Sequence, residues 1–174
     1  MTFFRHGLIT LLLAGLIAAL VAATIIVGGR FDVSVSAQLP PPIHDLIHLT
    51  RVNAVKRATR DLQGRPADLN DRQVLLDAVR SFQALCADCH SPPGFPTPPL
   101  ARSLNPPPAD LTEVAGKRTL EELFWVTKHG IRMSAMPAWG QSQSDERLWA
   151  IATLVAHFAE LSAAEYRAVS TAAE

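Results

Sequence analysis

Cysteine is scarce in this chain of 174 residues, which contains only Cys86 and Cys89. Both lie in one short motif, so no disulfide framework is available. Charge of one sign is also lacking, because sixteen lysines and arginines balance sixteen aspartates and glutamates. This balance gives no indication of a nucleic-acid partner or of a strongly acidic protein partner.

Strand signals are lacking as well. The sequence contains no convincing run of β-type residues and no two-residue hairpin signal between such runs. Apolar residues recur instead at helical spacings of three and four, separated by proline-rich segments. The sequence therefore predicts an all-α fold, in which three helices of the main domain bracket two loops.

The two cysteines belong to the pentad Cys86-Ala87-Asp88-Cys89-His90, the C-x-x-C-H spacing of covalent haem attachment. Positions three and four apart share a face of a helical turn, so both thiols and the His90 imidazole can point the same way. Each thiol would add to a vinyl group of the porphyrin, and His90 would bind the iron. The motif predicts one covalently attached haem c, held by Cys86 and Cys89, with His90 as a metal ligand.

Two other uses of a C-x-x-C pair are less well supported. A zinc site needs four ligands and would have to recruit histidines such as His44 and His48, but their order and long separation from the cysteines argue against it. A thioredoxin-like redox pair begins a helix inside a βαβ pattern, which this sequence does not show. Haem attachment is the favoured interpretation.

One long hydrophobic run, residues 8–27, contains neither charge nor proline. About 20 apolar residues at 1.5 Å each span roughly 30 Å, the thickness of the hydrocarbon core, whereas a cleaved signal peptide has an apolar region of about 7 to 15 residues. An uncleaved transmembrane anchor is predicted, and the alternative is secretion with cleavage after residues 35–37. Because c-type haem is attached outside the cytoplasmic membrane, the rest of the chain is expected on the periplasmic side.

We expect three parts: an anchor over 1–30, a proline-containing linker with a juxtamembrane helix over 31–69, and a haem domain over 70–174. Residues 39–42, Leu-Pro-Pro-Pro, predict a stiff extended spacer. The helical pattern of residues 43–63 is basic in its second half. This segment could contact anionic lipid or a partner subunit, but a solvated face packed loosely on the domain is the favoured interpretation.

Capping signals place the helices of the haem domain. Asn70 or Asp71 can cap a helix that runs towards the haem motif. Residues 119–122 form a capping box that opens a short helix, which Gly130 stops with a left-handed residue. Residues 142–145 begin a last long helix whose apolar stripe reaches Leu161. The apolar stripe of the first of these helices consists of Leu75, Val79, Phe82 and Cys86.

The segment after His90 is predicted to be a loop, because prolines exclude helix from residues 91–99. A second proline cluster at 105–111 continues the irregular region towards Thr119. A backbone carbonyl in the 91–99 loop is expected to accept the His90 Nδ1 proton, which would fix the tautomer and orient the ring towards iron.

The second axial ligand is expected shortly after Gly130, where two methionines compete. Met136 precedes a proline and is therefore pushed into extended geometry, which lets its thioether project from a rigid loop. Met136 is the predicted iron ligand, and Met133 is expected to fill the core. His129 could compete as a second imidazole, but its place at a helix end favours a surface or capping role.

The haem motif, the 130–140 segment with Met136-Pro137 and the flanking helices resemble a class I cytochrome c domain, especially the small membrane-anchored monohaem cytochromes of bacteria. The resemblance covers roughly residues 71–166. It implies a haem pocket closed by crossing N- and C-terminal helices, with Phe82 packed near Trp149 or Ala152. It also implies His90 and Met136 as axial ligands.

Two departures from the family accompany this resemblance: Ser91 and Ala135 stand where several members have glycine. We expect them to alter local loop shape more than ligation. The anchor, the proline spacer and the helix from Ile43 lie outside the family core, so the resemblance implies nothing about them. The hydrophobic run and haem attachment outside the cytoplasm predict a single-pass protein of a bacterial cytoplasmic membrane.

With both axial positions filled, the iron has no open site for a substrate, so the sequence predicts an electron carrier and not an enzyme. The expected function is one-electron transfer from a respiratory dehydrogenase or quinol-oxidising complex to a terminal oxidase or similar acceptor. The alternatives are a fixed haem c subunit of a larger membrane redox complex and a gas sensor or peroxidase with an open iron position. Expected partners are redox proteins or a membrane complex, with no nucleic acid and no small-molecule substrate.

Overall fold

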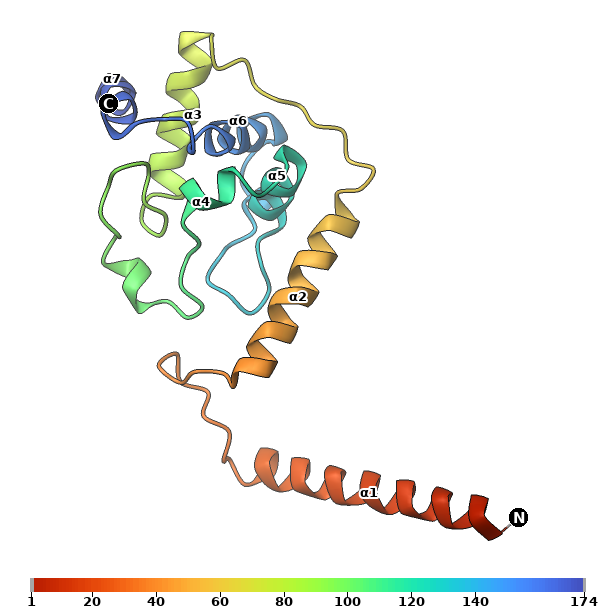
Figure 1. The fold of residues 1–174 in the computed structure, drawn as a ribbon. Coiled ribbons are helices and arrows are strands. Elements are labelled where there is room, and N and C mark those ends of the chain that lie inside the picture. The colour runs from red at the N-terminus through yellow and green to blue at the C-terminus, as the bar shows by residue number, and fades with distance from the viewer. Residues whose placement is uncertain (1, 174) are drawn as a thin grey trace. The chain divides into compact units, whose positions relative to one another are not determined.

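The computed structural model describes residues 2–173, and over this range every regular element is helical. The predicted all-α fold is confirmed. The chain forms two compact units, Met1–Gln38 and Leu39–Glu174. The first holds helix α1, and the second holds helices α2 to α7 together with the short 3-10 helices η1 and η2 (Figure 1).

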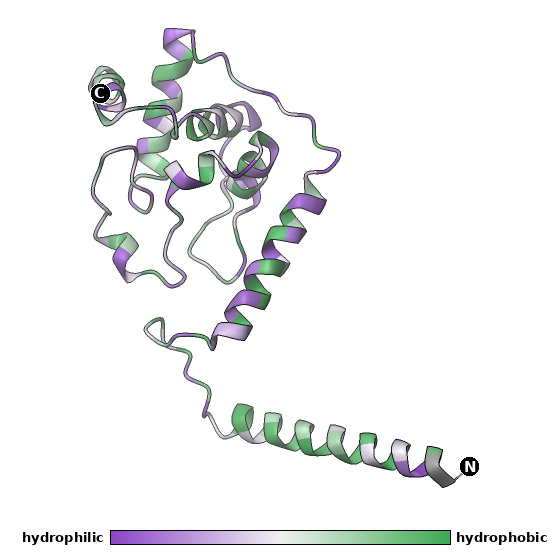
Figure 2. Ribbon diagram, in the orientation of Figure 1, coloured by the Kyte–Doolittle hydropathy of each residue, from purple (hydrophilic) through white to green (hydrophobic). Residues whose placement is uncertain are grey.

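Helix α1 (Thr2–Val27) contains a stretch, Phe4–Val27, that is long and apolar enough to cross a membrane. All of the side chains described in this stretch are exposed, and Figure 2 shows hydrophobic residues along most of the helix. A helix that is apolar on every side and packs against nothing in its own unit has the character of a membrane segment. The hydrophobic run thus forms one continuous helix, and its composition indicates membrane anchoring.

Helix α2 (Pro41–Ala58) begins inside the proline run, so the prediction of an extended spacer over 39–42 is wrong beyond Pro40. Pro40 is the extended N-cap residue, and Pro41 and Pro42 lie in the first turn, where a missing N–H group costs no hydrogen bond. The helix also ends earlier than the predicted Gln63. Thr59 Oγ1 donates to the Val55 carbonyl at 3.0 Å, and the chain turns there.

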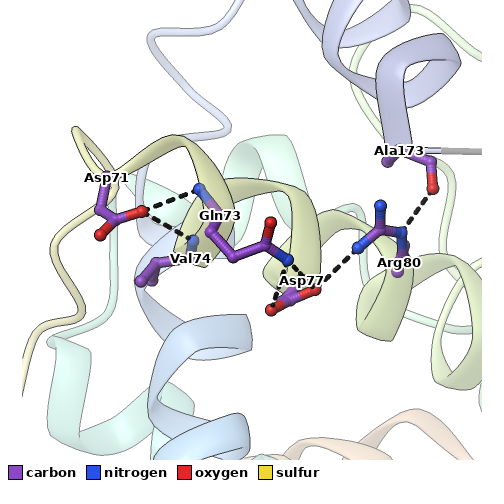
Figure 3. Close-up of polar contacts among 6 residues, drawn as sticks. All are labelled: Asp71, Gln73, Val74, Asp77, Arg80 and Ala173. Carbon is purple, nitrogen blue, oxygen red and sulfur yellow. Dashed lines mark hydrogen bonds and ion pairs between the residues drawn. The ribbon is translucent and has the colours of Figure 1, made fainter.

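Helix α3 (Arg72–Leu85) begins at its predicted cap. Asp71 Oδ1 accepts hydrogen bonds from the backbone N–H groups of Gln73 at 2.8 Å and Val74 at 3.3 Å (Figure 3). Val79 and Phe82 are fully buried, and Cys86 directly after the helix is buried too. The predicted apolar stripe is confirmed, so one helix face both packs the core and delivers the first cysteine.

The irregular region after His90 contains two short elements that the sequence analysis did not predict. They are the 3-10 helix η1 (Leu100–Ser103) and helix α4 (Leu111–Ala115). Asp110 caps α4 by accepting a hydrogen bond from Thr112 N at 2.8 Å. Helix α5 (Leu120–His129) begins at the predicted Thr119 cap, whose side chain accepts from Glu122 N, and the 3-10 helix η2 (Trp139–Gln141) follows.

The prediction of one last long helix reaching Leu161 is wrong. Helix α6 (Asp145–Ala156) begins within the predicted 142–145 segment, with Ser144 as its cap, but ends sooner, and a further helix, α7 (Ala163–Ala173), follows a turn. A reciprocal capping box starts α7: Ser162 N donates to Glu165 Oε2 at 2.8 Å, and Glu165 N donates to Ser162 Oγ at 3.2 Å. The domain therefore has more helices than the predicted three.

Phe82 lies at the centre of an aromatic cluster between α3 and the C-terminal segments. Its ring meets Phe158 edge-on at a centroid distance of 5.1 Å and Tyr166 at 6.4 Å. Phe82 was expected near Trp149 or Ala152. Its ring contacts are with Phe158 and Tyr166, and the Trp149 ring stacks on Phe124 at 3.8 Å. The α3 helix does pack on α6, which carries Ala152, and the unpredicted helix α7 supplies Tyr166 to the Phe82 cluster.

Polar contacts fasten α7 to the rest of the domain. Arg80 Nε donates to the Ala173 carbonyl at the end of α7 at 2.6 Å, while its Nη1 pairs with Asp77 at 2.8 Å (Figure 3). Arg167 on α7 donates to the Gly94 carbonyl at 3.3 Å. Helix α7 is thereby connected both to α3 and to the loop that follows His90.

Candidate haem site

The Cys86–His90 motif forms a turn directly after α3. Cys86 is the C-cap residue, and its carbonyl accepts hydrogen bonds from Cys89 N at 3.0 Å and His90 N at 2.8 Å. These two bonds bring the three side chains of the motif to one short turn, as the spacing predicts. Both cysteines are free thiols and not a disulfide.

Cys86 lies in an apolar setting. Burial, with a smaller contribution from the negative charge of a Cys89 thiolate, raises the pKa of the Cys86 thiol to about 12. The site thus favours a neutral sulfur at this position. A thioether is also an uncharged sulfur, so the product of covalent attachment is compatible with the apolar setting of Cys86.

His90 is oriented by a backbone carbonyl, because its Nδ1 lies 2.9 Å from Ala109 O. A carbonyl oxygen can only accept, so Nδ1 carries the proton and Nε2 keeps its lone pair, which is the tautomer that binds a metal through Nε2. Burial lowers the pKa of His90, while the bond to Ala109 works in the opposite direction. The imidazole is therefore favoured in its neutral, metal-binding form.

The partner of His90 was expected in the 91–99 loop, and that prediction is wrong, because Ala109 belongs to the second proline cluster. Two carbonyls of the 91–99 loop accept hydrogen bonds from within the loop: Phe95 N donates to Pro92 O at 3.1 Å, and Ser91 Oγ donates to Pro96 O at 3.1 Å. The loop therefore folds on itself, and the second cluster lies beside the ring.

Met136 lies in the loop between α5 and α6, which is closed by three hydrogen bonds. Ile131 N donates to Met136 O at 3.2 Å, Met136 N donates to Ser134 Oγ at 3.2 Å, and Ser134 Oγ donates to Ile131 O at 2.7 Å. Met136 is partly buried. Its backbone is thus fixed on both sides, although no hydrogen bond joins it to the Cys86–His90 turn over residues 2–173.

Met133 does not fill the core as expected. Its side chain is 80% exposed, and its backbone has a φ of +60°, which is uncommon for a residue with a side chain. The other candidate, His129, is exposed at the end of α5, with its ring 4.8 Å from that of Trp125. Met133 therefore projects to the surface, and His129 is a surface residue of α5.

Gly130 makes the turn from α5 into this loop, with φ +66° and ψ −171°. The positive φ agrees with the predicted stop, but ψ places the residue in an extended region that is essentially restricted to glycine. An added Cβ would lie 2.7 Å from Met136 O and 2.8 Å from Pro137 O. A side chain at position 130 would therefore displace the backbone of the loop that carries Met136.

Gly130→Ala is expected to destabilise the domain by about 1–3 kcal/mol, because the backbone conformation is strained for alanine and the Cβ meets backbone atoms. Thermal or denaturant unfolding measures the loss. Gly116→Ala is the matched control, since Gly116 has φ −82° and its Cβ would meet nothing within 4 Å. Equal stabilities of the two variants would contradict this explanation of the turn.

Comparison with known protein families shows that residues 75–155 match the model of cytochrome C oxidase, cbb3-type, subunit III. Residues 75–155 form a c-type cytochrome domain. The matched range begins in α3 and ends in α6, so it includes both the Cys86–His90 turn and the loop of Met136. No curated protein and no solved structure gave a match.

A c-type cytochrome domain carries covalently bound haem c, and the predicted cofactor is confirmed at this level. The residues present fit that group: a buried neutral sulfur, a second free thiol one turn away and an imidazole with a free Nε2. Figure 1 shows the α3–α4 and α5–α6 loops extending from the same side of the helices. The resemblance to class I cytochrome c is consistent with these findings.

The zinc alternative is not supported by the structure. His44 Nδ1 lies 3.2 Å from Asp45 Oδ1, and His48 Nδ1 lies 3.0 Å from an Arg51 nitrogen, all four residues being on α2. In the described part of the chain, no three side chains of the types His, Cys, Asp and Glu gather where they could hold a metal ion.

The sequence analysis did not predict the roles of two residues of the c-type cytochrome domain, Ala109 and Ser134. Ala109 acts through its carbonyl, and a backbone acceptor 19 residues from His90 leaves no signal in side-chain chemistry. Ser134 was identifiable, because a serine two residues before Met136 is able to accept from that residue's backbone N–H.

Proposed function

We propose that this domain transfers one electron at a time through a single haem held by Cys86 and Cys89, with His90 and Met136 as axial ligands of the iron. The family match indicates haem-based electron transfer. The observation that carries the residue assignment is the His90–Ala109 bond, which leaves Nε2 of the C-x-x-C-H histidine free to bind. The closed loop around Met136 supports the assignment of the second ligand.

The bound haem supplies an iron that alternates between ferrous and ferric states. His90 contributes a neutral imidazole held in one orientation, and Met136 contributes a soft thioether, a pair that favours the ferrous state more than an anionic ligand would. Two filled axial positions leave no place for oxygen or a substrate. The residues therefore support an electron carrier rather than an enzyme with its own catalytic site.

For the whole chain we propose a membrane anchor over 1–30, a linker with its helix over 31–69 and the cytochrome domain over 70–174. The apolar helix α1 supports the anchor. Haem attachment outside the cytoplasm supports a location on the periplasmic side of a bacterial membrane. There the domain would connect a respiratory dehydrogenase or quinol-oxidising complex to a terminal oxidase or similar acceptor.

A second candidate function is a fixed haem c subunit of a larger membrane redox complex. The observation that favours it is the match to a family described as a subunit of an oxidase. Solubilisation in mild detergent separates the two functions. Stoichiometric co-purification with other redox subunits supports the fixed subunit, and recovery of the protein alone supports the mobile carrier.

Haem attachment is tested on full-length protein matured in a host that attaches c-type haem. The intact mass should increase by one haem, and the adduct should survive denaturation. Cys86→Ala and Cys89→Ala should each weaken attachment and shift the optical spectrum, because one vinyl group stays unreacted. Colourless protein, or a mass without the adduct, would show that the proposed site is wrong.

Ser134→Ala is expected to weaken the bond of Met136 to iron, because it removes two of the three hydrogen bonds that close the loop and leaves only the one from Ile131 N to Met136 O. Losing one net hydrogen bond costs about 1 kcal/mol, so added imidazole should displace Met136 with roughly fivefold higher affinity. An optical titration of the ferric protein measures this. Ser103→Ala, at an exposed position in η1, should leave the affinity for imidazole unchanged. Identical imidazole titration curves for the native protein, Ser134→Ala and Ser103→Ala would exclude the bracing role of Ser134.

A further inference from the structure

The first half of α2 exposes an apolar surface that no element covers in the described part of the chain. Ile43, Leu46, Ile47 and Leu49 have exposed fractions between 39% and 64%. Single exposed apolar residues are ordinary on a protein surface. Four large ones within seven consecutive positions form a contiguous patch of the kind that marks an interaction site.

The patch faces away from the domain. Helix α2 contacts α5, and Val55 is buried while Val52 is partly buried. At 100° per residue, Ile43 and Leu46 lie about 120–180° around the helix axis from Val52 and Val55, while Ile47 lies about 80° from Val55. The surface that packs on the domain and the apolar surface are therefore two different sides of one helix, and the second side is available to another partner.

The second half of α2 and its C-terminal turn are basic. Over residues 41–60 the four cations, Arg51, Lys56, Arg57 and Arg60, are opposed by one carboxylate, Asp45. Lys56, Arg57 and Arg60 are exposed. Exposed apolar residues followed along the helix by exposed lysines and arginines suit contact with an anionic membrane surface, where the cations meet the headgroups. Figure 2 shows this mixture of hydrophobic and hydrophilic residues along α2, in contrast to α1.

The covalent chain limits how far α2 can be from the membrane. Residues 28–40, thirteen in all, join α1 to α2. Even fully extended they span at most about 45 Å, at roughly 3.3–3.6 Å per residue. If α1 is inserted, a lipid surface is held at high effective concentration near the patch, whereas any soluble partner has to be recruited from solution.

We propose that α2 is an interfacial helix, with Ile43, Leu46 and Ile47 inserted among the lipids of an anionic bilayer and Lys56, Arg57 and Arg60 at its headgroups. This inference rests on the proposed anchoring by α1. Its consequence for electron transfer is that the cytochrome domain is held against the membrane surface and not suspended freely on a tether. The α2–α5 contact then fixes the orientation of the domain towards membrane-bound redox partners.

The test is photocrosslinking of the full-length holoprotein in nanodiscs of phosphatidylglycerol and phosphatidylcholine. A genetically encoded diazirine amino acid is placed at position 46, in the patch, or at position 45 as the matched control. Asp45 is highly exposed and lies on a different side of the same turn. A third variant carries the diazirine at position 16, in the middle of α1. Mass spectrometry of the digested protein then identifies lipid or protein adducts.

The expected result is a lipid adduct in the variants with the diazirine at positions 16 and 46, and no lipid adduct in the control variant with the diazirine at position 45. A lipid adduct at 16 without one at 46 overturns the inference but leaves the anchor intact. Absence of an adduct at 16 shows instead that α1 is not inserted, so the proposed anchoring fails and the inference fails with it. A protein adduct at 46 reveals a second copy of the chain or another subunit on the patch and also overturns the inference.

A charge variant tests the basic half separately. With Lys56, Arg57 and Arg60 all replaced by glutamine, the lipid adduct at position 46 should fall in anionic nanodiscs to the yield found in nanodiscs of phosphatidylcholine alone. An unchanged yield would overturn the role of the cations at the headgroups. The haem spectrum of each variant confirms that the cytochrome domain itself is intact.

Discussion

Met136→Ala is expected to abolish the weak red absorption band that sulfur-to-iron charge transfer gives in a ferric His/Met cytochrome. The Met136 thioether is the expected source of that band. The other sulfur in the loop between α5 and α6, that of Met133, belongs to an exposed side chain, whereas the backbone of Met136 is fixed by hydrogen bonds. Loss of the soft ligand should also lower the reduction potential by on the order of a few hundred millivolts, within the roughly 0.8 V that axial ligands span. Optical spectroscopy and a redox titration measure both changes.

Met133→Ala is the control, because Met133 is exposed and is expected to leave the band and the potential unchanged. Loss of the band in Met133→Ala and its survival in Met136→Ala would reverse the assignment. Carbon monoxide adds a further check: the ferrous native protein should not bind it, and the Met136→Ala protein should. Binding by the native protein would favour the sensor or peroxidase with an open iron position.

The parts of the fold that the sequence predicted depend on local chemistry. Asp71, Thr119 and Ser144 cap helices where short polar side chains precede apolar periodicity, and each accepts a backbone N–H within its own first turn. The Cys86–His90 turn is local in the same way, since its backbone bonds join residues three and four apart. Such features need no knowledge of the rest of the chain.

The parts of the fold that the sequence analysis did not predict are of two kinds. Some depend on contacts between distant segments, and others have a local signal in the sequence. The acceptor of His90 is a backbone carbonyl, and its identity depends on how two proline-rich loops pack, which no periodicity encodes. Helix α7 is different, because Ser162 and Glu165 form a capping box that is visible in the sequence. Without α7, the contact of Phe82 with the Tyr166 ring could not be predicted, and the expectation named only Trp149 or Ala152 on α6.

Phe82→Ala is expected to destabilise the domain by about 3–5 kcal/mol, the range for removing a large aromatic side chain from a core. Phe82 is fully buried and contacts the rings of Phe158 and Tyr166, so its loss leaves a cavity between α3, α7 and the turn after α6. The melting temperature of the domain should fall by more than roughly 10 °C, given a size of about 100 residues. Thermal unfolding followed by helical circular dichroism measures the change.

Phe95→Ala is the matched control for this aromatic cluster. Phe95 meets Tyr166 edge-on at 5.9 Å and lies under the Arg167 guanidinium, but its side chain is 38% exposed. Removal of a partly exposed ring forfeits less buried area and lets water fill the space, so a loss of about 1 kcal/mol is expected. Similar losses for both variants would mean that Phe82 is not the centre of the core. Because Phe82 lies one helical turn before Cys86, its removal should also loosen the turn that carries the haem attachment site.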